Sequence, residues 1–404
     1  MSTSILYHSQ SIAGYTFKRA SFEGGACIYR ISPQERMFRC PICCSRDVQC
    51  RGSVHRTILL LPTGLRKNYA ELDIPRVYCP HCDKLRQICL GFAEDFRSYS
   101  KAFERYALEL CELMTINDVA RHLGVSWGTV KNIHKRHLQK KYGKPSLKNL
   151  RTLAIDEISN GKGHKYLTIV LNLDSGAVVF IGEGKGADAL SPFWKKLGRH
   201  RKKIRSVAAD MSPAYTKAIR ENLPHATLVY DHFHVIKLYN EKLSDLRREL
   251  YRTTENADEK EMLKGTRWLL LKNRENLNEE KNERERLEAA LAANTPLMTG
   301  YYLKEELHRI WKQQDHASAA GVLDAWVAMA ETSGVSMLRK FAQTLLEHRE
   351  GILNYYNSRI TTAALEGTNT KIRVLQRRAY GYRDKEYLEL RILALHETKF
   401  KAAI

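Results

Sequence analysis

Short runs of apolar and β-branched residues recur between positions 152 and 230, and polar or glycine-containing segments bound each run. Runs of this length and composition predict β-strands. Segments 187–197 and 214–221, which flank the fourth run, have helical spacing. This alternation predicts an α/β region. The expected strands are Thr152–Ile155, Tyr166–Leu173, Ala177–Ile181, Ile204–Ala209 and Ala226–Tyr230.

The strand pattern disappears from Val235 to about Ala342, where charged stretches with helical spacing replace it. This region is predicted to be all-helical, and Glu275–Ala293 is expected to be one of its long helices. The apolar stretches of the chain fall far short of the roughly 20 residues that a membrane-spanning helix needs. The sequence therefore predicts a protein without a membrane partner.

A further helical pattern, from Thr115 to His137, predicts a helix-turn-helix. Asn117 or Asp118 is expected to cap the first helix, and Gly124 to form the turn. The second helix presents hydrogen-bonding and cationic side chains that suit base edges and phosphates. The alternative is a surface pair of helices with a solvated basic face. The predicted DNA-binding residues of this helix are Ser126, Trp127, Thr129, Lys131, Asn132, Lys135 and Arg136.

Charge strengthens the expectation of a polyanionic partner. The 404 residues carry 66 Lys and Arg against 45 Asp and Glu, a formal charge of +21. Residues 1–150 hold 24 basic against 12 acidic residues, net +12, whereas residues 251–350 hold 15 against 17, net −2. The basic charge is therefore concentrated, and double-stranded DNA is the expected partner. With 43% hydrophobic residues, the chain is not of the disordered class.

All nine cysteines lie in the first 111 residues. Cys40 and Cys43, and Cys79 and Cys82, form two Cys-x-x-Cys knuckles of a zinc-ribbon layout. Four thiolates saturate Zn²⁺, so the predicted site is structural. Four buried free cysteines are the alternative interpretation. Other side chains could substitute for a ligand, namely Cys44, Cys50, His55 and His81.

Three carboxylates are candidates for a two-metal site. Asp156 ends the first expected strand of the α/β region, and Asp210 ends the fourth. Acidic residues at neighbouring strand ends can bridge two Mg²⁺ or Mn²⁺ ions through oxygen ligands, although single strand-end acids are more often turn or capping residues. Glu366 is the third candidate, on an expected helix.

The expected Glu366 helix carries Thr370, Arg373 and Arg377 on the same face, and spacing alone does not distinguish a functional face from an exposed charged helix. Its buried stripe is predicted to be Leu365, Ile372, Leu375 and Ala379. The predicted backbone-binding residues are Lys371, Arg373, Arg377 and Arg378.

These motifs together resemble the DDE transposases of bacterial insertion sequences, specifically the insertion-sequence L-three group, ISL3. The matching segments are Cys40–Cys43, Arg76–Cys82, Ile155–Glu157, Lys162–Tyr166, Ala209–Tyr215, Tyr230–Val235, Trp268–Asn273, Leu365–Ile372 and Ala379–Tyr382. The resemblance covers about residues 38–395. Cys44 and Asp83 depart from it, because such ribbons often carry Gly there, and Gly184-Lys185 replaces an expected Gly-Arg.

The resemblance implies an α+β multidomain fold with a zinc ribbon, a helix-turn-helix and an RNase H-like α/β core interrupted by an all-α insertion. The implied domains are 1–95 (zinc ribbon), 96–148 (helix-turn-helix), 149–245 (first part of the core), 246–350 (insertion) and 351–404 (remainder of the core). Asp156, Asp210 and Glu366 would be its catalytic triad. Asp231, His232 and His234 follow the fifth strand, and we consider Asp231, His234 and His164 for accessory roles or ordinary polar structure.

The implied function is that of a DNA transposase. It would bind the terminal inverted repeats of its insertion sequence and catalyse strand cleavage and transfer with two Mg²⁺ or Mn²⁺ ions, as at least a dimer on DNA. One alternative is a zinc-ribbon and helix-turn-helix regulator on an inactive scaffold, and another is a site-specific nuclease. Because the N-terminus has no secretory pattern, the expected location is the bacterial cytoplasm, at the nucleoid.

Overall fold

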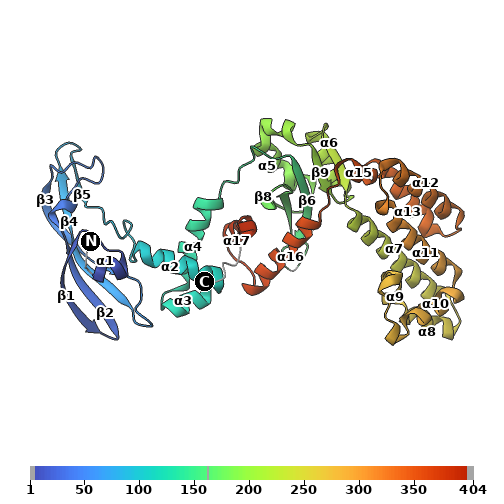
Figure 1. The fold of residues 1–404 in the computed structure, drawn as a ribbon, viewed down its shortest axis with the longest axis horizontal. Helices are drawn as coiled ribbons and strands as arrows, with labels where there is room; N and C mark the ends of the chain where they lie inside the picture. Colours follow the sequence, from blue (N-terminus) through green and yellow to red (C-terminus); the bar gives the residue numbers. More distant parts are fainter. Residues whose placement is uncertain (1–4, 162, 398–404) are drawn as a thin grey trace. The chain divides into compact units, whose positions relative to one another are not determined.

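The computed structural model describes residues 5–161 and 163–397 (Figure 1). The chain divides into two compact units, one ending at Gly143 and the other running from Lys144 to Glu397. The units contain two mixed β-sheets and many helices, so the expected combination of α and β structure is confirmed. Within the described ranges, no helix is long and apolar enough to span a bilayer.

The first unit is built on a five-stranded sheet of order β1-β2-β4-β3, with β5 paired to β4. Strands β2 and β4 run parallel and the other pairs antiparallel. Fully buried Ile58, Leu72 and Ile74 belong to its core. The elements are α1 (Ile5–Gln10), β1 (Tyr15–Glu23), β2 (Ala26–Pro33), β3 (Gln49–Leu59), β4 (Asn68–Cys79) and β5 (Lys84–Gln87).

Three helices complete this unit: α2 (Lys101–Leu113), α3 (Ile116–Leu123) and α4 (Trp127–Tyr142). The predicted turn is confirmed, because Gly124 has a left-handed φ of 62° between α3 and α4. The predicted cap of α4 is also confirmed, since Ser126 Oγ accepts the Thr129 amide at 3.1 Å.

The predicted cap of α3 is wrong. Thr115 precedes the helix in an extended conformation, and its hydroxyl accepts the amide of Asp118 at 3.2 Å. Asn117 and Asp118 already lie inside the helix. Thr115, Asn117 and Asp118 are all residue types that can cap a helix, so composition alone did not decide among them.

The second unit contains a five-stranded sheet of order β10-β9-β6-β7-β8. β6, β9 and β10 are parallel neighbours, whereas β7 and β8 are antiparallel to their neighbours. All five expected strands and both expected helices are confirmed. Their bounds are β6 (Thr152–Ser159), β7 (Tyr166–Asn172), β8 (Ala177–Glu183), α5 (Ala187–Leu197), β9 (Ser206–Ala209), α6 (Pro213–Asn222) and β10 (Thr227–Tyr230).

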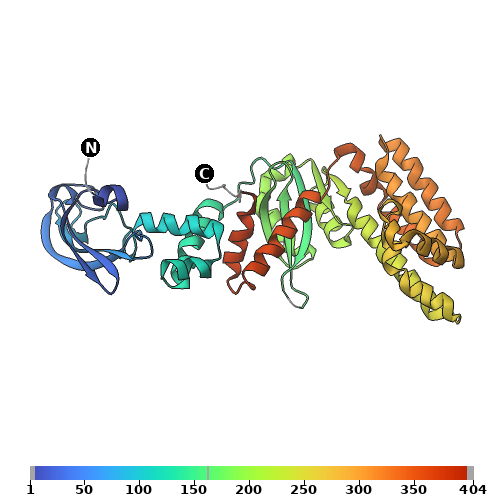
Figure 2. The same ribbon diagram turned by 60° about the horizontal axis from the view of Figure 1, so that its bottom comes forward.

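Side chains alternate between two hydrophobic clusters on the faces of this sheet. On one face, Ile155 and Ala209 pack with residues of α5 and α6. On the other, Ala154 and Ala208 pack with residues of α16 (Ala363–Arg378) and α17 (Lys385–Leu393). α16 crosses this second face (Figure 2). A helix from the end of the chain therefore covers strands formed some 200 residues earlier.

The segment between β10 and α16 is helical, as predicted. The expected single helix over Glu275–Ala293 is wrong, because only Glu283–Ala293 is α-helical, after two short 3₁₀ turns. Asn282 breaks the pattern with a left-handed φ of 49°. The helices are α7 (His232–Thr253), α8 (Ala257–Gly265), α9 (Arg267–Leu271), α10 (Glu283–Ala293), α11 (Thr295–His308), α12 (His316–Thr332), α13 (Ser336–Glu347), α14 (Arg349–Leu353) and α15 (Tyr355–Ser358).

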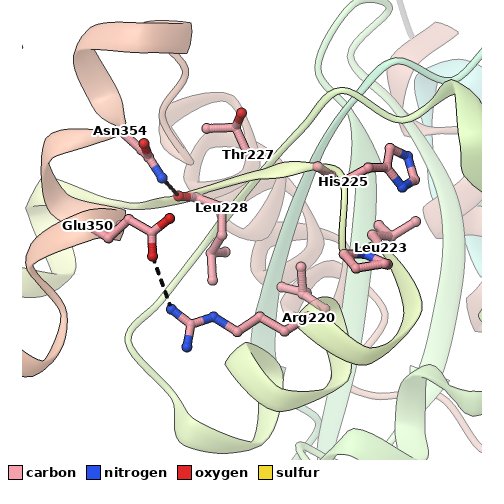
Figure 3. A pocket seen from close by; sticks show the side chains of 11 residues that line it. Arg220, Leu223, His225, Thr227, Leu228, Glu350 and Asn354 are labelled. Atoms are coloured by element: carbon pink, nitrogen blue, oxygen red, sulfur yellow. Dashed lines mark hydrogen bonds and ion pairs between the residues drawn. The ribbon is translucent and has the colours of Figure 1, made fainter.

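After the helical region, α14 packs against strand β10 of the sheet, beside an open cavity (Figure 3). At this cavity the Arg220 guanidinium lies 3.6 Å from the Glu350 carboxylate, and Asn354 Nδ2 donates to the Leu228 carbonyl at 3.0 Å. Next to Glu350, a Cβ placed on Gly351 would lie 2.3 Å from Cδ2 of buried Tyr230. Glycine is therefore required for this close approach.

We expect Gly351→Ala to lower the free energy of unfolding by about 1–3 kcal/mol, because the Tyr230 ring would have to move within a packed core. Gly321→Ala is the matched control, since a Cβ there meets nothing within 4 Å on α12. That control should keep or slightly raise stability. Equal unfolding midpoints for the two variants in urea would contradict this packing argument.

Candidate functional site

Three acidic residues lie at equivalent positions on three neighbouring parallel strands. Asp156 lies in β6, Asp210 directly follows β9 and Asp231 directly follows β10. The residues that precede these acids are paired with one another across the strands. Asp156 has the same strand parity as Ala154, so it faces α16. The sheet thus gathers the two predicted aspartates and adds Asp231.

Asp156 is held by two hydrogen bonds. Its Oδ1 accepts the Glu157 amide and its Oδ2 accepts Asn369 Nδ2 of α16, both at 2.8 Å. The side chain is only 8% exposed. Burial raises the pKa of Asp156, His234 opposes this rise, and the negative charges of Asp210 and Glu366 add to it. These couplings bring all three predicted carboxylates into one electrostatic environment.

Glu366 lies in the first turn of α16 and is exposed. Its carboxylate, the Asp231 carboxylate and a His234 ring nitrogen offer ligand atoms that all lie within 4.8 Å of one another. Carboxylate oxygens suit Mg²⁺ and Mn²⁺, and imidazole suits several transition metals. Glu366 therefore belongs both to the predicted triad and to a second group of possible metal ligands, which it forms with Asp231 and His234.

Unsatisfied polar atoms support a metal at this place. His234 Nε2 and Asn369 Oδ1 are buried and have no hydrogen-bond partner among the described residues. Buried donors and acceptors are normally paired. A cation with its water ligands would satisfy such atoms, so the residues present fit a divalent ion.

Asp231 is better suited to remain ionised than Asp156. Its own burial raises the pKa of Asp231, but contacts with His232 and Thr362 outweigh this effect and lower the pKa overall. Thr362, which precedes α16, donates its hydroxyl to Asp231 Oδ2. The N-terminus of α16 is thus attached to the acidic row.

The four knuckle cysteines form a second cluster, in the first unit. Cys40 Sγ lies 3.9 Å from Cys82 Sγ, and Cys43 Sγ lies 3.6 Å from Cys79 Sγ. All four sulfur atoms lie within 4.8 Å of one another. This set is compatible with tetrahedral Zn²⁺.

Each knuckle is followed by a residue in a left-handed conformation, although neither residue is glycine. Cys44 and Asp83 have left-handed φ values of 63° and 48°. The amide of Ile42 approaches Cys40 Sγ at 3.4 Å. Amides of the knuckle, led by that of Cys43, lower the pKa of Cys40 to about 6, which favours the thiolate that a metal binds.

The other side chains considered as zinc ligands lie outside this set. His55 Nδ1 is 2.9 Å from an Asp73 oxygen, and His81 Nε2 is 3.7 Å from an Asp47 oxygen. Cys44 and Cys50 are exposed.

The predicted recognition helix α4 presents Trp127, Asn132 and Arg136 at its exposed surface, while Val130 and Ile133 are buried. Lys131 Nζ lies 5.3 Å from the centroid of the Trp127 ring. Among the other predicted residues, Ser126 caps the helix and its hydroxyl contacts that of Thr129 at 2.9 Å. Lys135 is half-buried.

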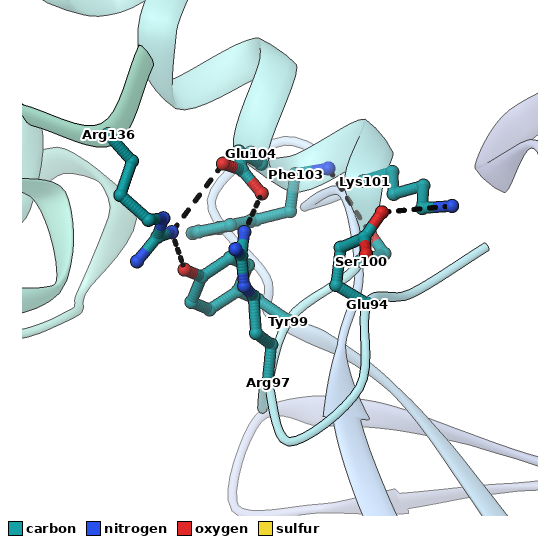
Figure 4. A network of polar contacts seen from close by, with 8 residues as sticks. All are labelled: Glu94, Arg97, Tyr99, Ser100, Lys101, Phe103, Glu104 and Arg136. Carbon is teal, nitrogen blue, oxygen red and sulfur yellow. Dashed lines mark hydrogen bonds and ion pairs between the residues drawn. The ribbon is translucent and has the colours of Figure 1, made fainter. Parts of the chain in front are cut away.

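Arg136 of α4 also packs within the unit (Figure 4). Its guanidinium donates to the Tyr99 hydroxyl and lies 3.5 Å from Glu104 of α2. Arg97 contacts the same Glu104 carboxylate at 2.8 Å. Arg136 therefore helps to fix α4 against α2.

Comparison with known sequences identifies the family to which this chain belongs. The family model for DDE transposases of the ISL3 type, described as a transposase, matches residues 153–392. The chain belongs to transposase family ISL3. A second model, the helix-turn-helix domain of the same family, matches residues 88–138. The protein is thus a DDE-type DNA transposase, and the family implies use of a divalent metal and binding of DNA.

Two curated relatives agree with this assignment. The transposase for insertion sequence element IS1001 of Bordetella parapertussis is 32% identical over 367 residues, covering 90% of each chain. The transposase for IS1557 of Mycobacterium tuberculosis is 28% identical over 397 residues, covering 91% of this chain and 87% of the relative. The Drosophila P element transposase strand transfer complex matches 74% of this chain and 91% of its own, with a TM-score of 0.38 and 12% identity.

The charged face of α16 in this transposase is exposed, with Glu366, Thr370, Arg373 and Arg377 open to solvent, and exposure alone does not distinguish a functional face from a solvated one. Leu365, Ile372 and Leu375 are buried, but the inclusion of Ala379 in the buried stripe is wrong. Ala379 ends the helix as its C-cap and is exposed. His164 is also exposed, in the loop between β6 and β7.

Asn369 and Thr362 are site residues that the sequence interpretation missed. Asn369 follows Glu366 by three positions, so helical spacing places both on adjoining surfaces of α16. The available sequence signal was that Asn369 is a polar residue within the apolar stripe of the expected helix. Its partner Asp156 is 213 positions away, a separation at which sequence patterns carry no pairing information.

We expect Asn369→Leu to slow DNA cleavage by about 10–100-fold, because it removes the amide that orients Asp156. The Mg²⁺ concentration for half-maximal cleavage should rise about tenfold, a shift that general loosening of the fold would not produce. Thr370→Val, on the exposed neighbour, serves as the control. An unchanged Mg²⁺ dependence in Asn369→Leu would refute the orienting role.

Proposed function

We propose that this transposase binds the terminal inverted repeats of its insertion sequence and catalyses DNA cleavage and strand transfer at Asp156, Asp210 and Glu366. The observation that carries the proposal is the register of β6 and β9, which sets the two aspartates side by side beneath the helix of Glu366. The order of β6 to β10 and the covering helix support an RNase H-like core.

The site residues act by binding and orientation. Asn369 holds one oxygen of Asp156, and the amide of Ser212 holds Asp210 Oδ1 at 3.0 Å, so both carboxylates are oriented before DNA arrives. Two bound Mg²⁺ or Mn²⁺ ions would activate the attacking oxygen and stabilise the leaving 3′-oxygen. Asp231 and His234 supply further donors beside Glu366.

The basic residues of α16 are proposed to hold the DNA backbone. Arg373 and Arg377 follow Glu366 at helical spacing and are exposed, as are Lys371 and Arg378. Phosphate contacts of this kind give salt-dependent affinity and carry no sequence information. They would therefore position the cleaved strand while α4 reads the end sequence.

In the first unit, the proposed functions are structural zinc binding and end recognition. The sheet with its cysteine cluster would form a zinc ribbon over residues 1–95, followed by the helix-turn-helix over 96–148. The remaining divisions are proposed at 149–245, 246–350 and 351–404. Two ends must be joined in one complex, so the active assembly is proposed to be at least a dimer, at the bacterial nucleoid.

Cleavage of a duplex that carries the element's end tests the function. The transposase should cut it only with Mg²⁺ or Mn²⁺, and joined donor and target products should follow. Cleavage without joined products would indicate the site-specific nuclease instead. A protein that bound but never cut would be a regulator, contrary to the proposal.

Charge reversal on α4 tests the recognition helix. Lys131→Glu with Lys135→Glu is expected to weaken end binding about tenfold or more at moderate salt, because phosphate contacts are lost. Metal affinity at the second unit should not change. Arg136→Glu should in addition destabilise the first unit, since it removes the contacts with Tyr99 and Glu104. Unchanged gel retardation of end fragments by the double variant would exclude α4 as the reader.

A further inference from the structure

The C-terminal end of α16 presents an aromatic side chain in an unusual way. Tyr380 is fully exposed, at 101% of its reference surface, and has a left-handed φ of 51°. Its amide donates to the Arg377 carbonyl at 3.1 Å, and the Gly381 amide donates to the Gln376 carbonyl at 3.0 Å. These bonds define a Schellman motif with Tyr380 at the position that glycine normally takes.

The residues on either side of this tyrosine are held by their surroundings. Gln376 Nε2 donates to Asn160 Oδ1 at 3.0 Å, which ties the end of α16 to the β6–β7 loop. Tyr382 is half-buried and lies 5.9 Å from the Tyr387 ring of α17. Tyr380 therefore projects from a held backbone, although glycine would fit this conformation with less strain.

The surroundings of Tyr380 are strongly basic. Lys371, Arg373, Arg377, Arg378 and Arg383 are all exposed. In the part of the chain that the structure describes, none of these five forms an ion pair with a carboxylate. A lone exposed aromatic residue needs no explanation. An aromatic ring in a strained conformation among unpaired cations fits a ligand that combines phosphates with flat apolar rings.

We propose that Tyr380 is a base-stacking residue, which packs its ring against an unstacked base of the bound DNA end. The inference rests on the proposed path of DNA along α16. Tyr380 follows Glu366 by 14 positions, or about 21 Å along a helix at 1.5 Å per residue. At 3.4 Å per base pair, the contacted base lies within about six pairs of the cleaved phosphate.

The test places 2-aminopurine singly at each position within six pairs of the cleavage point in a duplex with the element's end. Full-length protein carrying Asp210→Ala is used, so that binding is measured without cleavage. One position should become brighter by several-fold on binding, because 2-aminopurine is quenched mainly by its neighbouring bases and leaves them when it packs against Tyr380. The same protein with Tyr380→Phe should give the same signal.

Tyr380→Gly is the decisive variant, because it should fold better and function worse. Glycine relieves the left-handed strain, so the melting temperature should rise by about 2–4 °C. The fluorescence change should disappear and end affinity should fall about tenfold, as expected for loss of one stacked base. Tyr302→Ala, at a half-exposed tyrosine of α11, should leave the signal unchanged.

Absence of any brighter position, or an undiminished signal in Tyr380→Gly, would overturn the stacking proposal. Loss of self-association in Tyr380→Gly with an unchanged signal would also overturn it, in favour of a contact between protein copies. Failure of the proposed chemistry is distinguishable, because it would appear as persistent cleavage by Asp210→Ala protein.

Discussion

Asp210→Ala is expected to reduce cleavage of end DNA by about a thousandfold or more while leaving binding intact. Asp210 directly follows β9, and Asp156 lies beside it across the parallel pair. Removing one carboxylate leaves too few oxygens to hold two divalent ions between phosphate and protein. Cleavage rates at saturating protein and Mg²⁺, with binding measured separately, check the expectation.

Asp188→Ala provides the matched control, because Asp188 is an exposed acid of α5 on the same unit. It should cleave at nearly the rate of the unaltered transposase. The two variants should bind end DNA equally, since α4 belongs to the other unit. Undiminished cleavage by Asp210→Ala would remove Asp210 from the active site and leave Asp231, His234 and Glu366 as the candidate metal ligands.

Cys79→Ser is expected to have the largest effect on folding. Cys79 is fully buried and its sulfur lies 3.6 Å from that of Cys43. Zinc bound by four thiolates supplies roughly 10–16 kcal/mol of apparent binding free energy in small zinc domains, which is folding free energy for the region it closes. Bound zinc should fall from one ion per chain to nearly none, and the first unit should become sensitive to proteases.

Cys50→Ser is the control for this prediction, since Cys50 is exposed on β3 and lies outside the cysteine cluster. It should retain zinc and protease resistance. The second unit should melt unchanged in both variants, because it has its own hydrophobic clusters. Full protection of the first unit in zinc-free protein would show that the metal does not stabilise it.

Sequence patterns predicted the second sheet well because strands and amphipathic helices are local features. The five strands differ from expectation only at their ends, and α5 has the expected bounds. Errors arose where several residues could play one role, as with the cap of α3, or where a single residue interrupts a favourable pattern. Asn282 is the second case, since its left-handed conformation separates α10 from the preceding turns.

The candidate site was predictable only in part. Asp156 and Asp210 could be selected because each follows an apolar run of residues, although Asp156 lies inside β6 and not at its end. Glu366 could be selected because α16 has a regular charged face. The hydrogen bonds of Asn369 and Thr362 join positions more than 100 residues apart, so only the folded chain reveals them. Tyr380 lies in the matching segment Ala379–Tyr382, but no pattern gave it a role of its own, because its distinguishing feature is a backbone angle.

The late position of α16 has a consequence for how this transposase is made. Glu366 follows Asp210 by 156 positions, so a ribosome adding about 5–20 residues per second needs roughly 8–30 s to proceed from one to the other. Through that interval the emerging polypeptide already contains α4, the proposed recognition helix, but lacks the third predicted acid, Glu366. If α4 reads the ends as proposed, nascent or prematurely terminated chains would bind end DNA without cleaving it.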